Sequence, residues 1–302
     1  MPIHLPPLSR RAFLKTSLAA GVAAMLPGRL SAGTAAVDVN RVALLADTHV
    51  FGDPATVNRD IQSAETAAEA LRQVLALDPL PAHLIVAGDC AALAGEAADY
   101  VTLARLLKPV RAAGVAVHLA LGNHDHREHL CAAFPETRPK GEADVPEKCV
   151  GVVTTPRADM VLLDSLNQTN VTPGLLGPAQ VAWLDRMLAA RPKKPTLVLA
   201  HHDPDRREKP TGLTDTDALF QVLAARRSVQ AYVFGHTHRW SVTGTGDVRQ
   251  VNVPTTAWVF DKKQPRGWVD AHLEADGLRL VLQTLDPSDP RHGKTERLAW
   301  QR

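Results

Sequence analysis

The sequence is poor in aromatic residues, cysteine and net charge. Phe, Trp and Tyr make up 4% of its 302 residues, so a core must consist mainly of Ala, Val and Leu. The three cysteines, Cys90, Cys131 and Cys149, have neither the number nor the spacing of a zinc–thiolate site. In an oxidising compartment Cys131 and Cys149 could pair, and the sequence alone leaves this open.

Charge is nearly balanced once the N-terminus is set aside. The whole chain has a formal charge of +2, and its first 35 residues hold four basic and no acidic side chains, so the rest carries −2. A near-neutral protein gives no electrostatic basis for a nucleic-acid partner or a stable membrane partner. With 45% apolar and 22% charged residues, the composition is that of a globular protein of one large domain or two small ones.

The N-terminus has the organisation of an export signal. Residues 9–15 read Ser-Arg-Arg-Ala-Phe-Leu-Lys, a short apolar run follows over residues 16–26, and residues 31–36 are small. The apolar run is too short to span a bilayer. The segment closely resembles a twin-arginine (Tat) signal, the alternative being an Arg-rich first helix. The resemblance implies a signal at residues 1–36, the Tat export machinery as partner, and a periplasmic or secreted location.

Buried strands alternate with helical segments in the first half of the chain. Residues 41–46, 83–87 and 115–121 are apolar runs typical of strands that are covered on both faces. Between them, residues 60–77 and 96–113 have the apolar spacing of helices. This order predicts an α/β sheet whose site lies at the carboxyl ends of the strands.

The second half continues with mixed elements. Further strands are expected at residues 150–153, 160–163, 195–200 and 230–234, and further helices at residues 177–190 and 214–226. Thr214 or Asp215 is the expected cap of the last helix. Residues 241–285 alternate Val or Leu with polar residues, which predicts antiparallel strands. Residues 127–150 are interpreted as a loop or small lid, and the residues from 286 onward as loosely held.

Five strand ends carry side chains that bind metal ions or move protons. They are Asp47-x-His49, Gly88-Asp89, Gly122-Asn123-His124-Asp125, His201-His202 and Gly235-His236-x-His238. One such Asp alone is usually a turn former, but five in order are hard to explain structurally. Carboxylates, imidazoles and an amide, without a thiolate, suit Mn, Fe, Zn, Co or Ni ions. The ligands are too many for one ion and about right for two.

In this order and spacing the motifs resemble the calcineurin-like metallophosphoesterases, over about residues 41–260. The similarity is greatest to the branch that contains bacterial cyclic-nucleotide phosphodiesterases, and it lies in the motifs Gly122-Asn123-His124-Asp125-x-Arg127, Leu163-Asp164-Ser165, His201-His202-x-Pro204 and Gly235-His236-Thr237-His238. The resemblance implies a single metallophosphoesterase domain at residues 37–302. The implied fold is a four-layer αββα sandwich of the α/β (α+β) class, with two mixed β-sheets face to face and helices outside.

The resemblance also implies the roles of individual residues. One metal would be held by Asp47, His49, Asp89 and His238, and the other by Asp89, Asn123, His201 and His236. Asp89 would bridge the two ions, which would lower the pKa of a shared water until hydroxide exists near neutral pH. His124 matches the histidine that protonates the leaving oxygen, with Asp125 as its orienter. Arg127 and His202 are weaker candidates for substrate contact.

The expected activity is hydrolysis of phosphodiesters or phosphomonoesters of small molecules such as nucleotides. Cys90-Ala91-Ala92 lacks the Asp, Asn or Tyr that many relatives place three residues after the bridging acid. The missing Tyr argues against a purple acid phosphatase, and the missing Asp or Asn, together with export, weakens the cyclic-nucleotide interpretation. The alternatives are a strict phosphomonoesterase and a non-catalytic metal- or phosphoryl-binding protein on the same fold.

Overall fold

The first of two sheets joins strands from both ends of the described chain. The computed structural model describes residues 36–137, 145–244 and 248–301. In sheet order the strands are β12 (Thr295–Ala299), β11 (Gly277–Thr284), β10 (Gly267–Leu273), β1 (Val37–Leu45), β2 (Leu80–Val86) and β3 (Ala116–Leu119). The last three run parallel to one another, whereas the first three are antiparallel to their neighbours. The sheet is therefore mixed, as predicted.

The second sheet is also mixed. In sheet order its strands are β4 (Gly151–Thr154), β5 (Asp159–Leu162), β6 (Thr196–Leu199), β7 (Val229–Phe234), β9 (Arg249–Asn252) and β8 (Ser241–Thr243). The four central strands are parallel, and the two edge strands are antiparallel to their neighbours. The predicted strand pair at residues 150–153 and 160–163 is confirmed as β4 and β5.

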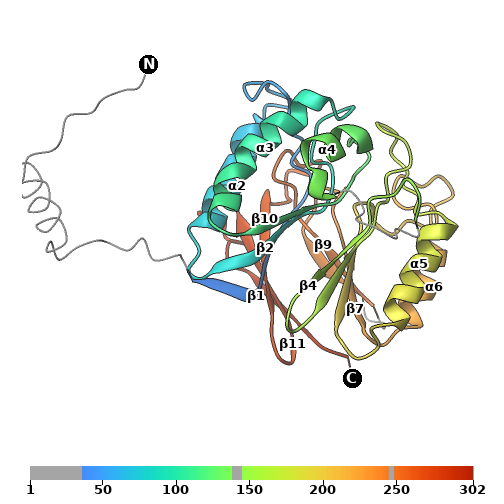
Figure 1. Ribbon diagram of the computed structural model, residues 1–302. Coiled ribbons are helices and arrows are strands. Elements are labelled where there is room, and N and C mark those ends of the chain that lie inside the picture. Colours follow the sequence, from blue (N-terminus) through green and yellow to red (C-terminus); the bar gives the residue numbers. More distant parts are fainter. Residues whose placement is uncertain (1–35, 138–144, 245–247, 302) are drawn as a thin grey trace, which may run out of the picture. The chain divides into compact units, whose positions relative to one another are not determined.

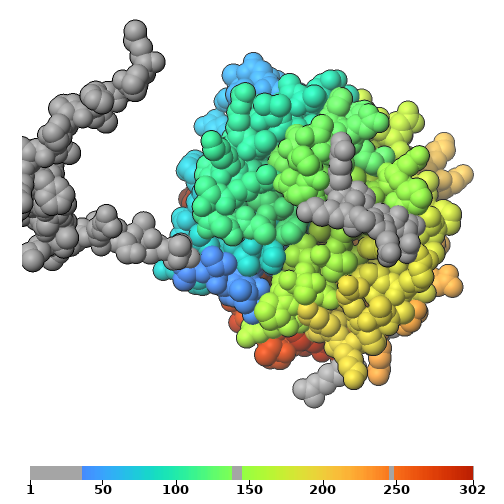
Figure 2. All heavy atoms as spheres, viewed as in Figure 1, coloured from blue at the N-terminus to red at the C-terminus, as the bar shows by residue number. Residues whose placement is uncertain are grey.

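Helices cover the outer faces of both sheets. The longer ones are α2 (Ser63–Leu75), α3 (Ala97–Ala112), α5 (Pro178–Ala189) and α6 (Thr216–Ala224). Figure 1 shows α2 and α3 beside the first sheet, and α5 and α6 beside the second, with the two sheets between them. Figure 2, drawn from the same side, shows the atoms of the blue-green and yellow segments packed closely on the face that is visible. Across the described ranges, no helix combines the length and apolar character that a bilayer crossing needs.

Successive side chains of β1 are buried on opposite faces of the first sheet, which explains the four layers. Ala43 and Leu45 belong to the apolar cluster that the first sheet forms with α2 and α3. Val42 and Leu44 point the other way and pack with strands of the second sheet. A third cluster joins the outer face of the second sheet to α5 and α6. Since side chains alternate along a strand, a wholly apolar strand is buried on both sides, and the predicted αββα sandwich follows.

Two segments differ from the sequence interpretation. Residues 127–137 form the helix α4 (Arg127–Ala133) and the 3-10 turn η1 (Pro135–Thr137) instead of a loop, because Leu130 and Phe134 are buried in the first helix–sheet cluster. The prediction that the residues from 286 onward are loosely held is wrong. It forms β12, which pairs with β11 along its length, and Leu298 packs against the cluster between the sheets.

Asp215 is the N-cap residue of α6, as expected, but its side chain makes no capping hydrogen bond to the helix. Its carboxylate accepts hydrogen bonds from the backbone N–H groups of Leu176 and Gly177, at 3.1 and 2.9 Å. Asp215 therefore joins the start of α6 to the segment that leads into α5. The predicted signal covers residues 1–36, all of which except Ala36 lie outside the described residues.

Candidate metal centre

The five motif-bearing loops meet at one edge of the two sheets. They follow β1, β2 and β3 in the first sheet and β6 and β7 in the second. Backbone hydrogen bonds join neighbouring loops: the N–H of Asp47 donates to the carbonyl of Gly88, and the N–H of Gly235 donates to that of His201, each at 3.0 Å. Because parallel strands end at the same edge of a sheet, residues far apart in the sequence converge here.

The backbone at this edge is strained in a consistent way. Of the ten described non-glycine residues with a positive φ, five come from the motifs: Asp47 (52°), His49 (43°), Asp89 (47°), His236 (65°) and His238 (53°). Left-handed backbone is uncommon for residues with a side chain and costs of order 1–3 kcal/mol each. All five belong to the expected ligand set. Such strain persists where the surrounding structure enforces it, which is typical of functional sites.

One group of side chains combines Asp47, His49 and His238, all buried, with ligand atoms within 4.8 Å of one another. The Nε2 atoms of the two histidines lie 3.1 Å apart, and Nε2 of His238 lies 3.4 Å from Oδ1 of Asp47. Nδ1 of His238 is 2.5 Å from the carbonyl oxygen of Trp258. A proton on Nδ1 would donate to that carbonyl and leave Nε2 with a lone pair for a metal ion.

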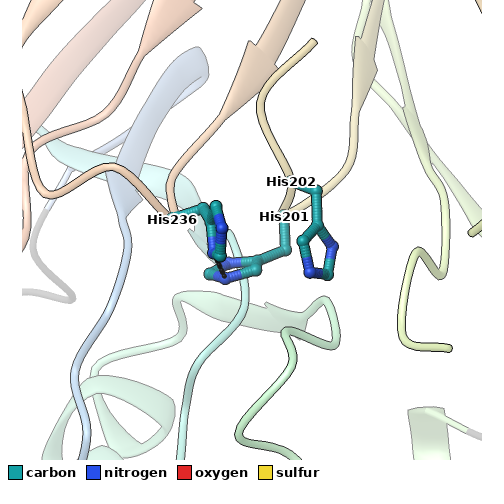
Figure 3. Close-up of side chains that lie close together, drawn as sticks. All are labelled: His201, His202 and His236. Atoms are coloured by element: carbon teal, nitrogen blue, oxygen red, sulfur yellow. Dashed lines mark hydrogen bonds between the residues drawn. The ribbon is translucent and has the colours of Figure 1, made fainter. Parts of the chain in front are cut away.

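A second group lies around His201 and His236, which come from the loops after β6 and β7 (Figure 3). Nε2 of His201 is 3.2 Å from Nδ1 of His236 and 3.3 Å from Oδ2 of Asp89. The other nitrogens of the two rings face backbone carbonyls, that of Ala87 at 2.8 Å and that of Thr211 at 3.0 Å. These carbonyls orient both rings so that one nitrogen of each faces the group.

Asp89 lies between the two groups. Its Oδ2 atom is 3.7 Å from Nε2 of His49 and 3.3 Å from Nε2 of His201. Its other oxygen, Oδ1, accepts a hydrogen bond from the backbone N–H of His124 at 2.8 Å. One carboxylate oxygen is thus held by the loop after β3, and the other faces histidines of both groups.

One structural observation, which does not depend on the motifs, indicates that these residues suit metal ions. Asn123 is 4% exposed, and its Oδ1 atom is buried without a hydrogen-bond partner among the described residues. A buried carbonyl oxygen without a partner is costly. A cation would satisfy this oxygen, and it would also satisfy the histidine nitrogens that face one another.

The electrostatics agree with bound cations. Burial raises the pKa of Asp89, but His201 and His49 outweigh it, so that pKa lies well below its ordinary value. Burial lowers the pKa of His49 to about 3 and that of His236 to about 4. Burial also lowers the pKa of His201, yet Asp89 and Asp47 outweigh it and raise it to about 10. The site thus favours anionic carboxylates and a positive charge beside Asp89, where a metal ion would take the place of the proton.

His124 lies at the edge of this site and lines a cavity of about 1230 Å³ together with His49, Asp89, Asn123 and His238. Its Nδ1 atom is 2.7 Å from the carbonyl oxygen of Leu93. A proton on Nδ1 donates to that carbonyl, so Nε2 remains for a partner in the cavity. This arrangement suits a group that exchanges a proton with a bound molecule.

Asp125 does not orient His124, contrary to expectation. Its carboxylate is fully buried and accepts hydrogen bonds from three backbone N–H groups, those of Gly122, Cys90 and Ala91, at 2.8 to 3.1 Å. It also accepts one from the hydroxyl of Tyr100 at 3.0 Å. Asp125 therefore holds the loops after β2 and β3 together, and the ring of His124 is oriented by Leu93.

Arg127 and His202 are placed away from the cavity surface. The guanidinium of Arg127 donates two hydrogen bonds to Asp164, at 2.7 and 3.1 Å, and one to the carbonyl of Leu166. His202 is fully buried, with Nδ1 2.8 Å from Oγ of Ser165. Neither residue lines the cavity. The geometry therefore does not support the substrate contacts expected of Arg127 and His202. Both side chains make contacts within the fold instead.

The cavity has lining residues that the motifs did not indicate. Arg59 and Phe260 line it together with Trp258. Both new residues lie in loops outside the five motifs. Two aromatic residues at positions 258 and 260 of an aromatic-poor chain are the signal that could have pointed to them.

A four-layer sandwich with carboxylates, histidines and an amide converging at one sheet edge defines a metal-dependent phosphoesterase. The chain belongs to the calcineurin-like phosphoesterase family, whose model matches residues 40–240. Enzymes of this family depend on a dinuclear metal centre. Residues 7–27 match the signal sequence of the twin-arginine translocation pathway, so the chain also carries the export signal that the N-terminus predicted.

Relatives of known name are similar over most of the chain. A "Probable cyclic nucleotide phosphodiesterase" of Rhodopseudomonas palustris is 32% identical over 206 residues, which cover 65% of this chain and 70% of the relative. A protein of the same description from Synechococcus sp. is 27% identical, with 78% and 88% covered. The 3′,5′-cyclic adenosine monophosphate phosphodiesterase CpdA of Escherichia coli is 27% identical, with 78% and 86% covered.

A solved structure confirms the fold. A dimetal phosphatase from Danio rerio superposes with a TM-score of 0.67 and covers 87% of this chain and 99% of its own. Sequence identity is 14%, so the likeness concerns the fold alone. The expected αββα architecture is confirmed in this comparison as well as in the layers described above.

Proposed function

We propose that this protein is an exported dinuclear-metal phosphoesterase that hydrolyses phosphodiester or phosphomonoester bonds of small molecules such as nucleotides. The observation that carries the proposal is the position of Asp89, with one oxygen 3.7 Å from His49 and 3.3 Å from His201. A carboxylate between two groups of histidines suits a pair of ions that share it. The relatives named as cyclic nucleotide phosphodiesterases support the nucleotide class.

The ligand sets follow from the two groups. One ion would be held by Asp47, His49, His238 and the shared Asp89. The other would be held by Asp89 with the three remaining ligands, Asn123, His201 and His236. When bound, the ions supply Lewis acidity, which neutralises charge on the phosphate oxygens and acidifies a water molecule. The donor set suits Mn, Fe, Zn, Co or Ni ions and does not select one of them.

The remaining chemistry belongs to side chains of the chain itself. His124, with Nδ1 turned to the carbonyl of Leu93, holds a proton on Nε2 that it donates to the leaving oxygen. A general acid of this kind contributes ~10²–10⁴-fold to the rate. The backbone N–H of His124 binds Oδ1 of Asp89, so the proton donor and the shared carboxylate are positioned by the same residue. No covalent intermediate on the protein is required.

The organisation and location of the chain complete the proposal. Residues 1–36 would be the export signal and residues 37–302 a single catalytic domain. The twin-arginine machinery, which transports folded proteins, would carry the enzyme after it has bound its metals. The destination is the periplasm or the medium.

Metal content and turnover, measured on the same samples, test the proposal. We expect Asn123→Ala and His236→Ala each to lose about one metal ion per chain, and to lose turnover. His118→Ala is the matched control, because His118 lies in β3 and does not line the cavity. Two ions retained in both variants would contradict the ligand sets.

The substrate class needs a panel of esters. We expect the metal-loaded protein to hydrolyse bis-p-nitrophenyl phosphate, p-nitrophenyl phosphate or cyclic nucleotides. Hydrolysis of p-nitrophenyl phosphate without any diester would identify a strict phosphomonoesterase. Metal uptake without hydrolysis of any ester in the panel would identify a binding protein and contradict the proposal.

A further inference from the structure

The cavity has an aromatic wall on the side of the first metal group. The ring of Trp258 stacks on His49, with centroids 4.3 Å apart and planes 28° apart. The ring of Phe260 stacks on His238 at 4.5 Å and the same angle. Both aromatic residues line the cavity. The side chains of two expected metal ligands are therefore backed by rings that also face the substrate space.

Part of the cavity lining near this wall is apolar and exposed to solvent. Phe260 is 61% exposed, and Leu93, which lines the same cavity, is 56% exposed. An exposed apolar surface that lines the cavity indicates a ligand with a flat apolar face.

Arg59 supplies a cation at this wall. Its guanidinium carbon lies 5.4 Å from the Trp258 ring and 5.6 Å from the Phe260 ring. Of the three other arginines that line the cavity, Arg206 pairs with Asp217 and Arg207 with Asp205, whereas Arg239, like Arg59, forms no ion pair with a described carboxylate. Within the described ranges no carboxylate forms an ion pair with Arg59. Arginine beside aromatic rings is a common way to bind a planar base.

The wall and the proton donor lie on the same side of the site. The ring of His49 stacks on Trp258 and lies 5.3 Å from that of His124. His124 is in turn bonded to the carbonyl of Leu93. A leaving oxygen that takes its proton from His124 would therefore carry its organic group past Leu93 and the aromatic wall.

We propose that Arg59, Trp258 and Phe260 form a subsite for a nucleobase on the organic group of the substrate. The inference rests on the proposed function, since it places the base relative to the scissile phosphate. The base stacks on the arginine–aromatic layer and accepts a hydrogen bond from the guanidinium of Arg59. The subsite selects nucleotides among phosphoesters of equal charge.

Binding, rather than turnover, tests the subsite. The phosphonate analogues of adenosine 5′-monophosphate and ribose 5-phosphate, in which a carbon replaces the ester oxygen and prevents hydrolysis, carry the same charged group and differ in the base. In equilibrium dialysis against the metal-loaded protein, we expect the nucleotide analogue to bind about 5- to 100-fold more tightly, because stacking of a base is worth ~1–3 kcal/mol. Phe260→Ala and Arg59→Gln should each reduce this ratio at least about threefold.

The ratio is the readout because a general disturbance of the metal centre weakens both ligands alike. Leu175→Ala is the control, since Leu175 is a partly exposed apolar residue that does not line the cavity. Equal binding of the two compounds to the wild type, or an unchanged ratio in both variants, would overturn the subsite. Failure of the proposed function would show instead as absence of hydrolysis across the ester panel, whatever the binding ratio.

A second inference comes from the cysteines. Cys131 in α4 and Cys149 just before β4 have their Sγ atoms 3.5 Å apart. A disulfide needs about 2.05 Å, so a small movement of the side chains suffices. Cys90 is fully buried and lies elsewhere, with its sulfur facing the carbonyl of Ala120. The structure thus places two of the three sulfurs together.

We infer that Cys131 and Cys149 form a disulfide once the folded chain meets a disulfide donor outside the cytoplasm. The thiolate of Cys149, the less buried of the two, attacks the donor disulfide, forms a mixed disulfide and releases one donor thiol. The thiolate of Cys131 then attacks Sγ of Cys149 and releases the second donor thiol. Two protein thiols are oxidised, the donor disulfide is reduced to two thiols, and the two protons lost by the protein thiols end on the donor thiols.

Thiol counting on the purified, folded full-length chain tests this inference. After incubation with oxidised glutathione and denaturation, we expect one thiol per chain, that of Cys90, and a mass about 2 Da lower than that of the reduced chain. Cys90→Ala should then show no thiol and the same loss of mass. Cys149→Ser should show no internal disulfide. Three thiols in the treated wild type, or glutathione adducts in place of an internal bond, would overturn the inference.

Discussion

A Cβ atom built on Gly122 would lie 2.1 Å from Oδ1 of Asp89 and 2.4 Å from its backbone nitrogen. The loop after β3 therefore contacts the shared carboxylate at a distance that no other residue type permits. The same oxygen accepts the N–H of His124. Close approach of this backbone is what fixes the orientation of Asp89 between the two histidine groups.

Gly122→Ala should consequently disturb the metal centre. The methyl group must displace Asp89 or the loop, which costs typically 1–3 kcal/mol. We expect a lower metal content and a turnover at least about tenfold lower. Gly151→Ala is the control, because a Cβ there meets no atom within 4 Å. Normal metal content in Gly122→Ala would show that the carboxylate position is less constrained than the geometry indicates.

His124→Gln should change the response to the leaving group. Without a proton donor, esters with poor leaving groups lose ~10²–10⁴-fold in rate, whereas p-nitrophenyl esters, which need little protonation, lose much less. The measurement is kcat for a series of esters of graded leaving-group pKa, with metal content checked on each sample. Equal slowing across the series would remove His124 as the proton donor.

Asp125→Ala should act through stability. Burial raises the pKa of Asp125 to about 6, and its removal leaves three backbone N–H groups and the Tyr100 hydroxyl without their acceptor. Each unpaired buried donor costs about 1–3 kcal/mol. We expect a fall of several kcal/mol in the free energy of unfolding.

The ratio of rates for poor and good leaving groups separates Asp125 from His124. Since the Asp125 carboxylate is bonded to loop backbone and Tyr100, we expect Asp125→Ala to keep the wild-type ratio in whatever fraction remains folded. A ratio shifted as in His124→Gln would restore Asp125 as the orienter of the imidazole.

Arg127→Met should destabilise the protein without weakening substrate binding. It leaves the buried carboxylate of Asp164 without its cation, and breaking such a pair from one side costs about 3–5 kcal/mol. Thermal unfolding gives the stability, and KM for a diester gives the binding. A rise of about tenfold in KM with unchanged stability would instead place Arg127 at the substrate phosphate.

The pair of Arg41 and Asp270 should make stability depend on pH. The guanidinium of Arg41 donates to both carboxylate oxygens, at 2.8 and 2.6 Å. Burial raises the pKa of Asp270, but Arg41 and His272 outweigh it and lower it below the ordinary 3.8. The contribution of the pair is therefore fully present above the ordinary pKa and is lost as the pH falls through the lowered one.

Asp270→Asn measures this contribution. The free energy of unfolding of the variant should lie below that of the wild type by about 1–3 kcal/mol at pH 7. The difference should shrink as the pH falls below about 4. A difference that stays constant with pH would show that the lost stability comes from packing and not from charge.

Much of the architecture could be predicted because buried strands have a recognisable local pattern of apolar residues. The runs Val42–Ala46 and Leu197–Ala200 are apolar at every position, a pattern typical of strands that are covered on both faces. The motifs at the ends of such strands likewise identified the side chains that converge, since parallel strands end at one edge. β12 was missed because an edge strand with alternating exposed residues has a weak apolar signal.

The sequence by itself determined which residues gather at this edge of the sheets and, through its motifs, the family to which the chain belongs. Only the tertiary structure decided what each of them touches. The family resemblance implies that Asp125 orients His124, yet the carboxylate of Asp125 accepts hydrogen bonds from Cys90 and Tyr100, and Nδ1 of His124 faces the carbonyl of Leu93. Hydrogen-bond partners are chosen by three-dimensional proximity, which sequence spacing does not encode. Gly122 and Asp89 are a further case, because their contact exists only after two separate loops have packed together.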